Sequence, residues 1–250
     1  MRDILSGRNA VFETLRSKRR QFFSLQVADS ARPAARLNEI LELASLQRIP
    51  VSRVAHLKLE SRDINHQGVV LEASRYPYVD LQDILDRAVQ AGEPPFILIL
   101  DALQDPQNFG ALLRTAEIAG VHGVLMPLAR AVEVTPAVVN ASAGATEHLY
   151  IASANLAQSI DSLKKLDVWI VGLDPRGEAL NRESDRYLRG ALGLVVGSEG
   201  EGLHDLVRKK CDILLRLPMR GKVESLNTAV AGSIALFLAQ LARQEPAGPE

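Results

Sequence analysis

The chain has 250 residues, enough for one large domain or two modest ones, and its 47% hydrophobic and 24% charged residues are typical of a globular protein that builds a core. No apolar run reaches the roughly 18–20 residues of a membrane helix, the first residues lack a signal-peptide pattern, and the single cysteine, Cys211, excludes a disulfide framework within one chain. These features favour a cytoplasmic protein with no membrane contact.

The net charge of −1 hides an uneven distribution along the chain. Residues 1–78 carry 13 Lys and Arg against 8 Asp and Glu, whereas the remainder carries 16 against 22. The densest basic cluster is Arg16, Lys18, Arg19 and Arg20. Such a cluster suits a phosphate backbone, although a solvated basic turn explains the charge alone equally well.

The first 76 residues alternate helix and strand signals, which predicts a compact α/β unit. Its expected helices lie near 10–15 and over 34–47, and its expected strands over 24–28, 51–55 and 68–74. Prolines and glycines then interrupt the pattern on either side of a short amphipathic helix at 81–89. We therefore place a linker at 77–94.

From Phe96 onward, short apolar runs predict strands that are buried on both faces of a parallel sheet. Helical patterns separate these runs, and that alternation predicts an open α/β sheet. The expected strands cover 96–101, 123–126, 168–174, 192–197 and 213–217, and the expected helices 109–119, 135–143, 155–165, 203–209 and 226–242. The last seven residues, QEPAGPE, are expected to fray.

Three polar segments follow predicted strands at their carboxyl ends, where ligands bind in open α/β sheets. The first is LDALQDPQNFGALLRTAEIAG, in which Asn108 is placed to cap the following helix. Arg114 falls within the first two helical turns, where a guanidinium can clamp a phosphate. Taken alone, this segment also fits a capped helix that merely carries a surface arginine.

The second segment, VVGSEGEGL, has three glycines in six residues, so its backbone N–H groups are open to a nucleotide or nucleoside. Glu199 would repel phosphates and suits a cationic or sugar-bearing ligand better. In the third segment, LRLPMRGKVESLN, Ser225 is placed to cap the long final helix. A plain turn and a simple helix cap are the alternatives for these two segments.

The three segments, in this order, resemble the three motifs of the SpoU-type RNA 2'-O-methyltransferases, members of the knotted SPOUT superfamily. The stretch TPAVVNASAGATEHL (135–149) resembles the family between the first two motifs. Near the N-terminus, GRNAVFETL and NHQGVVLE resemble the accessory domain of the bacterial ribosomal RNA branch, which is similar to ribosomal proteins that bind kinked RNA. The resemblance covers nearly the whole chain.

The resemblance implies an α/β fold whose open parallel sheet contains a deep trefoil knot, a feature otherwise essentially absent from proteins. It also implies the cofactor S-adenosylmethionine (AdoMet), bound in a bent form between the knot loops. The implied cofactor-binding residues are Gly197, Glu199, Gly200, Leu217, Met219, Ser225 and Leu226. The implied catalytic residues are Asn108, Arg114, Glu199, Ser225 and Asn227. Where many relatives have a serine, two residues after the motif asparagine, this chain has Ala229, so no hydroxyl acts there.

The implied organisation is an RNA substrate-binding domain at 1–76, a flexible linker at 77–94 and a catalytic domain at 95–250. The implied substrate is a guanosine of 23S ribosomal RNA, and the residues expected to contact RNA are Arg8, Arg16, Lys18, Arg19, Arg20 and His66. A chain shortened to begin near Pro94 is expected to fold. A homodimer is expected because the family forms one and because the final helix is apolar on more than one face; burial of that helix within its own domain is the alternative.

Methyl transfer to a hydroxyl requires no metal, and the five histidines and Cys211 show no metal-ligand spacing, so we expect no metal. The family proposal makes Arg114 the base that deprotonates the ribose hydroxyl. Because the pKa of a guanidinium lies above about 12, a phosphate clamp is the more physical role. Asn108 and Glu199 would then hold Arg114 and the ribose in register. The sequence leaves both roles open.

Other activities compete with this hypothesis. Within the family, the alternatives are a transfer RNA 2'-O-methyltransferase and an antibiotic-resistance ribosomal RNA methyltransferase. A nicotinamide-dependent oxidoreductase would need GxGxxG after the first strand of the sheet, whereas the glycine loop of this chain comes late and has the sequence GSEGEG. A non-catalytic RNA-binding protein that kept the fold would have no need of the catalytic residues that this chain retains.

Overall fold

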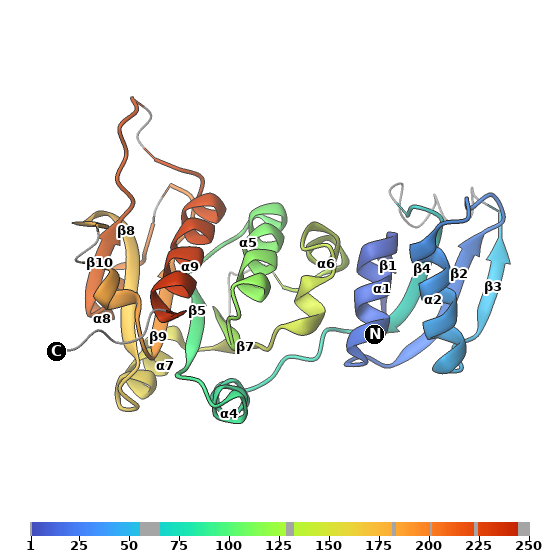
Figure 1. The fold of residues 1–250 in the computed structure, drawn as a ribbon, viewed down its shortest axis with the longest axis horizontal. Helices are drawn as coiled ribbons and strands as arrows, with labels where there is room; N and C mark the ends of the chain where they lie inside the picture. Colours follow the sequence, from blue (N-terminus) through green and yellow to red (C-terminus); the bar gives the residue numbers. More distant parts are fainter. Residues whose placement is uncertain are drawn as a thin grey trace. The chain divides into compact units, whose positions relative to one another are not determined.

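The computed structural model describes residues 2–55, 66–128, 133–181, 184–200, 202–222 and 225–244, and it divides into two units (Figure 1). Unit 1 contains residues 1–77 and 133–148, and unit 2 contains residues 78–132 and 149–250. The chain therefore passes between the units three times. The tail that is expected to fray lies outside the described residues from position 245 onward.

Unit 1 is built on a four-stranded sheet of order β1-β4-β2-β3, with the helices α1 and α2 packed against each other. β4 is antiparallel to β1 and β2, and β3 is parallel to β2. Its N-terminal elements are β1 (Arg2–Ser6), α1 (Arg8–Ser17), β2 (Phe22–Ala28), α2 (Ala35–Leu46), β3 (Val51–Val54) and β4 (Val69–Ser74). The sequence predicts all of them except β1, where Arg2 and Asp3 mask the apolar pattern of a strand.

A segment from the middle of the chain completes unit 1. α6 (Pro136–Ala141) contacts β1, and the 3-10 helix η1 (Ala145–His148) contacts α1. Val138, Val139 and Glu147 are completely buried in this packing. The sequence predicts a helix over 135–143 but assigns it to the catalytic domain, because nothing in its local pattern indicates which unit covers its apolar side.

Unit 2 is an open six-stranded sheet of order β10-β8-β9-β5-β6-β7, in which neighbouring strands run parallel to each other (Figure 1). Its strands are β5 (Phe96–Leu100), β6 (Gly123–Pro127), β7 (Ile151–Ala154), β8 (Trp169–Ala179), β9 (Leu192–Val196) and β10 (Ile213–Arg216). Its helices are α4 (Leu81–Ala91), α5 (Pro106–Ile118), α7 (Leu156–Lys164), η2 (Ser184–Leu188), α8 (Asp205–Lys210) and α9 (Thr228–Gln244). The predicted parallel α/β sheet is confirmed. β7 was missed because IASA offers only one large apolar residue.

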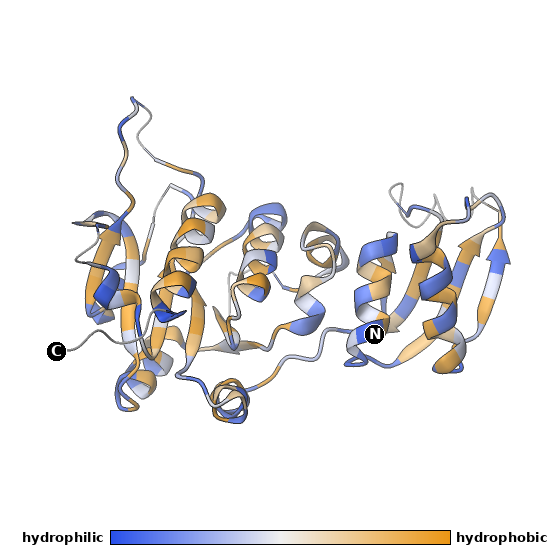
Figure 2. Cartoon of the chain, in the orientation of Figure 1, coloured by the Kyte–Doolittle hydropathy of each residue, from blue (hydrophilic) through white to orange (hydrophobic). Residues whose placement is uncertain are grey.

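Helices cover both faces of this sheet, so its central strands are hydrophobic along their length (Figure 2). Residues of α4, α7 and α8 form one hydrophobic cluster with the strands. On the other face, α9 packs against α5 and β9. A Cβ added at Gly232 would lie 2.9 Å from Leu112 and 3.3 Å from Val196, so the α9 backbone approaches both closely. No helix among the described residues is long and apolar enough to cross a membrane.

The interval 77–94, predicted as a flexible linker, contains α4, which belongs to the core of unit 2. A reciprocal capping box between Asp80 and Asp83 starts the helix, and Ile84 and Ala88 are completely buried. A chain beginning at Pro94 would therefore lack part of this core. Its residues 133–148, which belong to unit 1, would also be left without the other residues of that unit to pack against. We therefore predict that such a shortened chain is destabilised, contrary to the expectation from the sequence that it folds.

Candidate active site

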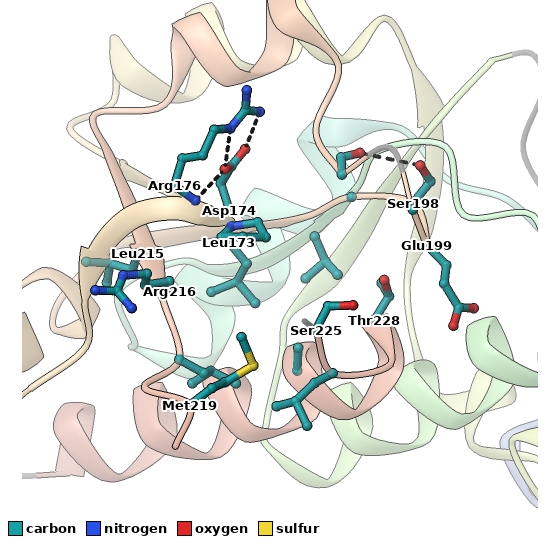
Figure 3. A pocket seen from close by; sticks show the side chains of 18 residues that line it. Leu173, Asp174, Arg176, Ser198, Glu199, Leu215, Arg216, Met219, Ser225 and Thr228 are labelled. Atoms are coloured by element: carbon teal, nitrogen blue, oxygen red, sulfur yellow. Dashed lines mark hydrogen bonds and ion pairs between the residues drawn. The ribbon is translucent and has the colours of Figure 1, made fainter. Parts of the chain in front are cut away.

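A pocket of about 530 Å³ lies beside the carboxyl ends of β8, β9 and β10 (Figure 3). Four stretches of chain line it: residues 173–176, residues 196–200 with Gly202, the residues Leu215, Arg216, Leu217 and Met219, and the residues Ser225, Leu226, Thr228 and Ala231. Pockets of this size at this edge of a parallel sheet are typical small-molecule sites.

An excursion in β8 supplies one wall of the pocket. Leu214 of β10 pairs with Gly172, whereas the next residue, Leu215, pairs with Glu178, so residues 173–177 leave the regular ladder. A Cβ at Gly177 would lie only 2.4 Å from the carbonyl oxygen of Leu214, so this position requires glycine. This wall was not predicted, although an Asp-Pro pair directly after an apolar strand was a signal for it.

The glycine loop that follows β9 supplies a second wall. The Ser198 and Gly202 backbones exchange hydrogen bonds of 3.0 and 3.2 Å. A Cβ at Gly197 would lie 2.3 Å from the Gly202 carbonyl carbon, so the loop closes on itself only with glycine at 197. Gly200 has a φ of 94° and open space around its Cα, which leaves the loop surface accessible to a ligand.

The structure brings all seven predicted cofactor-binding residues to this pocket. They are Gly197, Glu199, Gly200, Leu217, Met219, Ser225 and Leu226. They come from the second and third sequence motifs, which lie in the loops after β9 and β10. The other lining residues were not predicted, and among them residues 173–176 come from a segment that the sequence did not assign to the site.

A chain of hydrogen bonds joins the three sequence motifs. The Asn108 side-chain amide donates to Glu199 at 3.0 Å, and the Asn227 amide donates to the Asn108 side-chain oxygen at 3.0 Å. Three of the five predicted catalytic residues are therefore in direct contact. A fourth, Ser225, lines the pocket.

Two helix caps differ from the sequence predictions. The side chain of Asp105 accepts from the backbone N–H of Asn108 at 2.8 Å, so Asp105 caps α5. Asn227, not Ser225, caps α9, because its side-chain oxygen accepts from the N–H groups of Ala229 and Val230. The two residues that were predicted as caps therefore use their side chains elsewhere: Asn108 bonds Glu199, and Ser225 lines the pocket.

The fifth predicted catalytic residue, Arg114, is exposed on α5. Within the described part of the chain it makes no hydrogen bond or ion pair, so Asn108 and Glu199 do not hold it as expected. Its guanidinium keeps all of its donors for another molecule.

Charges of opposite sign stand on opposite sides of the pocket. Arg176 and Arg216 lie on one side and Glu199 lies on the other (Figure 3). Asp174 is buried beneath Arg176, and although burial alone would raise its pKa, hydrogen bonds from Arg176 and Arg208 lower the pKa to about 2. Asp174 is therefore a saturated carboxylate, whereas Glu199 is exposed and accepts from the amide of Asn108.

The described residues contain no group of three His, Cys, Asp or Glu side chains placed to hold a metal ion. Burial raises the pKa of the Cys211 thiol to about 12, so the sulfur stays protonated and is a poor nucleophile.

The basic residues predicted to contact RNA separate into buried and exposed groups. The Arg20 side chain is completely buried, donates to Glu147 at 2.7 and 2.9 Å, and donates to Asp3 at 2.8 Å. Burial alone would lower its pKa, but these carboxylates raise it. The prediction that Arg20 contacts RNA is therefore wrong, because its donors are saturated inside unit 1. Arg16 and Lys18 are exposed, as predicted for such contacts.

The other three residues of this set also bond within unit 1. Arg19 donates to the Tyr76 hydroxyl and to the Pro77 carbonyl oxygen. Arg8 donates to the carbonyl oxygens of Gln67 and Arg32. His66 is 1% exposed, and its Nδ1 accepts from the N–H of Gly68 at 2.8 Å. His66 thus makes a contact within the turn at 66–68, and it has no surface to offer RNA.

The protein has two units, and its pocket lies beside the carboxyl ends of strands in the parallel sheet of unit 2. Comparisons with known proteins identify the class of protein. The model of the SpoU rRNA methylase family matches residues 95–237, and the model for RNA 2'-O ribose methyltransferase substrate binding matches residues 4–79. The chain therefore belongs to the SpoU rRNA methylase family, which confirms the predicted family.

Relatives agree with this membership, and a solved structure shares the fold. The chain is 41% identical over 239 residues, 94% of each chain, to YacO of Bacillus subtilis, whose name places it in the TrmH family of tRNA/rRNA methyltransferases. It is 37% identical over 96% of each chain to the 23S rRNA (guanosine-2'-O-)-methyltransferase RlmB of Coxiella burnetii. It shares its fold with the SpoU methyltransferase AviRb of Streptomyces viridochromogenes, solved in complex with the cofactor AdoMet. That match has a TM-score of 0.79 and 22% identity, and it covers 96% of this chain and 90% of AviRb.

Proposed function

We propose that the chain is an AdoMet-dependent methyltransferase that methylates the 2'-hydroxyl of a guanosine ribose in 23S ribosomal RNA. The observation that carries the proposal is the hydrogen-bonded chain of Glu199, Asn108 and Asn227 beside a pocket lined by the glycine loop. Family membership supports RNA methylation, and the similarity to RlmB supports the ribosomal substrate. The proposal includes the trefoil knot that the motifs imply.

The pocket suits AdoMet by size and by chemistry. Its leucines offer apolar contact for an adenine, and the glycine loop allows close approach to the backbone; the leucines are Leu173, Leu215, Leu217 and Leu226. Glu199 offers a negative charge on one side of the pocket for a cationic ligand. When bound, AdoMet would supply an electrophilic methyl group, carried on its sulfonium, for transfer to a ribose hydroxyl oxygen.

The protein's contribution to this reaction is orientation. Of the two carboxylates lining the described part of the pocket, Asp174 is saturated by arginines, so Glu199 is the acceptor available to the ribose hydroxyl. Asn108 and Asn227 fix the position of Glu199. Arg114 clamps an RNA phosphate, because its exposed guanidinium makes no hydrogen bond or ion pair with another described residue and so keeps its donors for the substrate.

We also propose a homodimer through α9. Ala229, Gly232, Ala235 and Leu236 of this helix face their own unit, yet the side chains at Val230, Ile234, Phe237 and Leu241 are 40–58% exposed. Their spacing of three and four residues forms one apolar stripe. Sedimentation at micromolar concentration is expected to give a dimer, and Phe237→Glu is expected to give monomers. A monomeric wild type contradicts this part of the proposal.

The substrate is tested by transfer of a labelled methyl group from AdoMet to purified 23S ribosomal RNA and, separately, to transfer RNA. Preferential labelling of 2'-O-methylguanosine in 23S ribosomal RNA is expected. Preferential labelling of transfer RNA would favour the second candidate, a transfer RNA methyltransferase. This candidate is considered because the name of YacO includes both tRNA and rRNA as substrates. Calorimetry with the product S-adenosylhomocysteine, with and without a chelator, tests the metal-free cofactor site, and a requirement for a divalent ion would refute it.

A further inference from the structure

We infer that Asp101 is a positioning residue that fastens both ends of the glycine loop and so shapes the cofactor pocket; this inference rests on the proposed function. Asp101 directly follows β5, lies outside the pocket lining and is 3% exposed. Its backbone N–H donates to the carbonyl oxygen of Val196, the last residue before the loop, at 2.8 Å. One residue thereby reaches the start of the loop.

The carboxylate of the same residue holds the other end. It accepts from the backbone N–H of His204 at 2.7 Å, and it lies 2.9 Å from Nδ1 of the His204 ring. His204 ends the loop and begins α8. Because a buried carboxylate needs partners, and because these two nitrogens satisfy it, the bond ties the loop end firmly to the sheet.

The backbone next to Asp101 fits this role. Ala102 has a φ of 63°, a left-handed conformation that a residue with a Cβ rarely adopts. This left-handed residue comes immediately after Asp101, at the point where the chain leaves β5. Such local strain persists where the surrounding contacts hold it in place.

Glu199 connects this anchor to the reaction. It lies at the tip of the loop, between the ends that Asp101 holds, and its other support is the hydrogen bond from Asn108. Loosening the end at His204 would let Gly202 and Ser198 move, since their mutual backbone bonds depend on the loop remaining closed. Both the pocket wall and the Glu199 carboxylate would then lose their fixed positions.

The chain offers a matched control at Asp212. Its N–H donates to the Ile170 carbonyl oxygen at 2.8 Å, and its carboxylate accepts from the Ile170 N–H at 2.8 Å. Asp212 therefore makes the same kinds of bonds to a strand, but Ile170 is near the amino end of β8 and neither residue lines the pocket. The Asp212 carboxylate also pairs with Lys164 at 2.5 Å, so replacing either aspartate removes one backbone partner and one side-chain partner, whereas only Asp101 touches the loop.

The test compares the full-length chain with Asp101→Ala, Asp101→Asn, His204→Ala and Asp212→Ala by S-adenosylhomocysteine calorimetry, at a temperature where each variant is folded. Asp101→Ala is expected to weaken binding about ten- to a hundredfold, since two bonds to a charged acceptor are lost. His204→Ala keeps the backbone bond and should weaken binding only about threefold, as should Asp101→Asn, which can still accept from that N–H. Asp212→Ala should change affinity by less than about twofold.

Hydrogen exchange supplies a readout that needs no cofactor: the amides of Gly202 and His204 should exchange faster in Asp101→Ala than in Asp212→Ala. If Asp101→Ala does not fold, Asp101→Asn and His204→Ala decide by the same measurements. Wild-type affinity in the Asp101 variants, or equal losses in Asp212→Ala, would overturn the inference. Failure of the wild type to bind S-adenosylhomocysteine would instead overturn the proposed function, while the exchange comparison would still test the anchor.

Discussion

Two arginines, one in each unit, show how differently the same side chain is used in this protein. In unit 1, Arg20 is completely buried, and Glu147 and Asp3 bind its guanidinium. In unit 2, Arg114 is exposed, and its guanidinium makes no hydrogen bond or ion pair with another described residue. Because a buried charge is tolerated only when it is paired, Arg20 serves the fold, whereas Arg114 is available to a substrate.

The comparison teaches that a dense basic cluster is a poor guide to a binding surface. Arg20 belongs to the densest cluster in the sequence, yet its partner Glu147 is 127 residues away. Arg114 stands without basic neighbours in the sequence, yet it is the accessible one. Exposure, which decides between these roles, depends on contacts between distant residues.

The largest effect is expected for Arg20→Ala, which leaves Glu147 buried without a partner. We predict a loss of about 3–5 kcal/mol in the free energy of unfolding, measured by chemical denaturation. The control is Arg20→Met combined with Glu147→Leu, which should recover most of the loss because neither charge remains. Unchanged stability in Arg20→Ala would show that Arg20 is not a structural residue.

Arg114→Ala is expected to leave stability unchanged and to lower turnover about 10²–10³-fold, the usual cost of removing one oriented donor from an active site. Affinity for S-adenosylhomocysteine should stay within a few-fold, because the proposed clamp would act on RNA and not on the cofactor. Arg114→Lys keeps the charge but loses the planar fork, and intermediate turnover is expected. Loss of cofactor affinity with normal turnover at saturating AdoMet would mean that Arg114 is misassigned.

The sequence was sufficient for the features that depend on local pattern. Apolar runs predicted β5, β6, β8, β9 and β10, and the second and third motifs predicted seven residues that line the pocket. Features that depend on distant contacts were missed. The excursion at 173–177 is defined by a register shift against β10, and the place of residues 133–148 is defined by burial of Glu147 against Arg20.

The predictions of the two helix-capping residues were wrong for a different reason. Asp105, Asn108, Ser225 and Asn227 are all good capping residues, so propensity alone could not choose among them. The structure selects Asp105 and Asn227, and in doing so it leaves the amide of Asn108 to bond Glu199.

A smaller effect should come from the exposed members of the basic cluster. We predict that Arg16→Gln with Lys18→Gln weakens RNA binding and makes its salt dependence shallower, by about 0.7–0.9 in the log–log slope for each RNA phosphate that the variant no longer neutralises. Stability should be unchanged, since neither side chain is buried. Arg48→Gln, an exposed arginine of unit 1 outside the cluster, is the control. Equal effects of the two changes would point to general charge and not to a binding surface.

The smallest expected effect concerns a buried carboxylate, Asp174, and the way in which stability depends on pH. Hydrogen bonds from Arg176 and Arg208 hold the pKa of Asp174 at about 2, below its usual 3.8, so ionised Asp174 stabilises the folded state above about pH 4. That contribution should fade as the pH falls from about 4 through about 2. Denaturation of the wild type and Asp174→Asn should therefore give a difference in stability that is constant near neutral pH and narrows in acid. A difference that does not narrow would show that Asp174 is not the responsible charge.

The central claim is that the protein uses the pocket of unit 2 to transfer a methyl group from AdoMet to a ribose oxygen of RNA. The most direct measurement is to incubate the full-length chain with labelled AdoMet and total bacterial RNA, hydrolyse the RNA in alkali and identify the labelled product. A 2'-O-methyl group blocks cleavage of the adjacent phosphodiester bond, so we expect label in alkali-resistant dinucleotides that yield 2'-O-methylguanosine on enzymatic digestion. Label confined to mononucleotides that carry a methylated base, or no transfer at all, would contradict it.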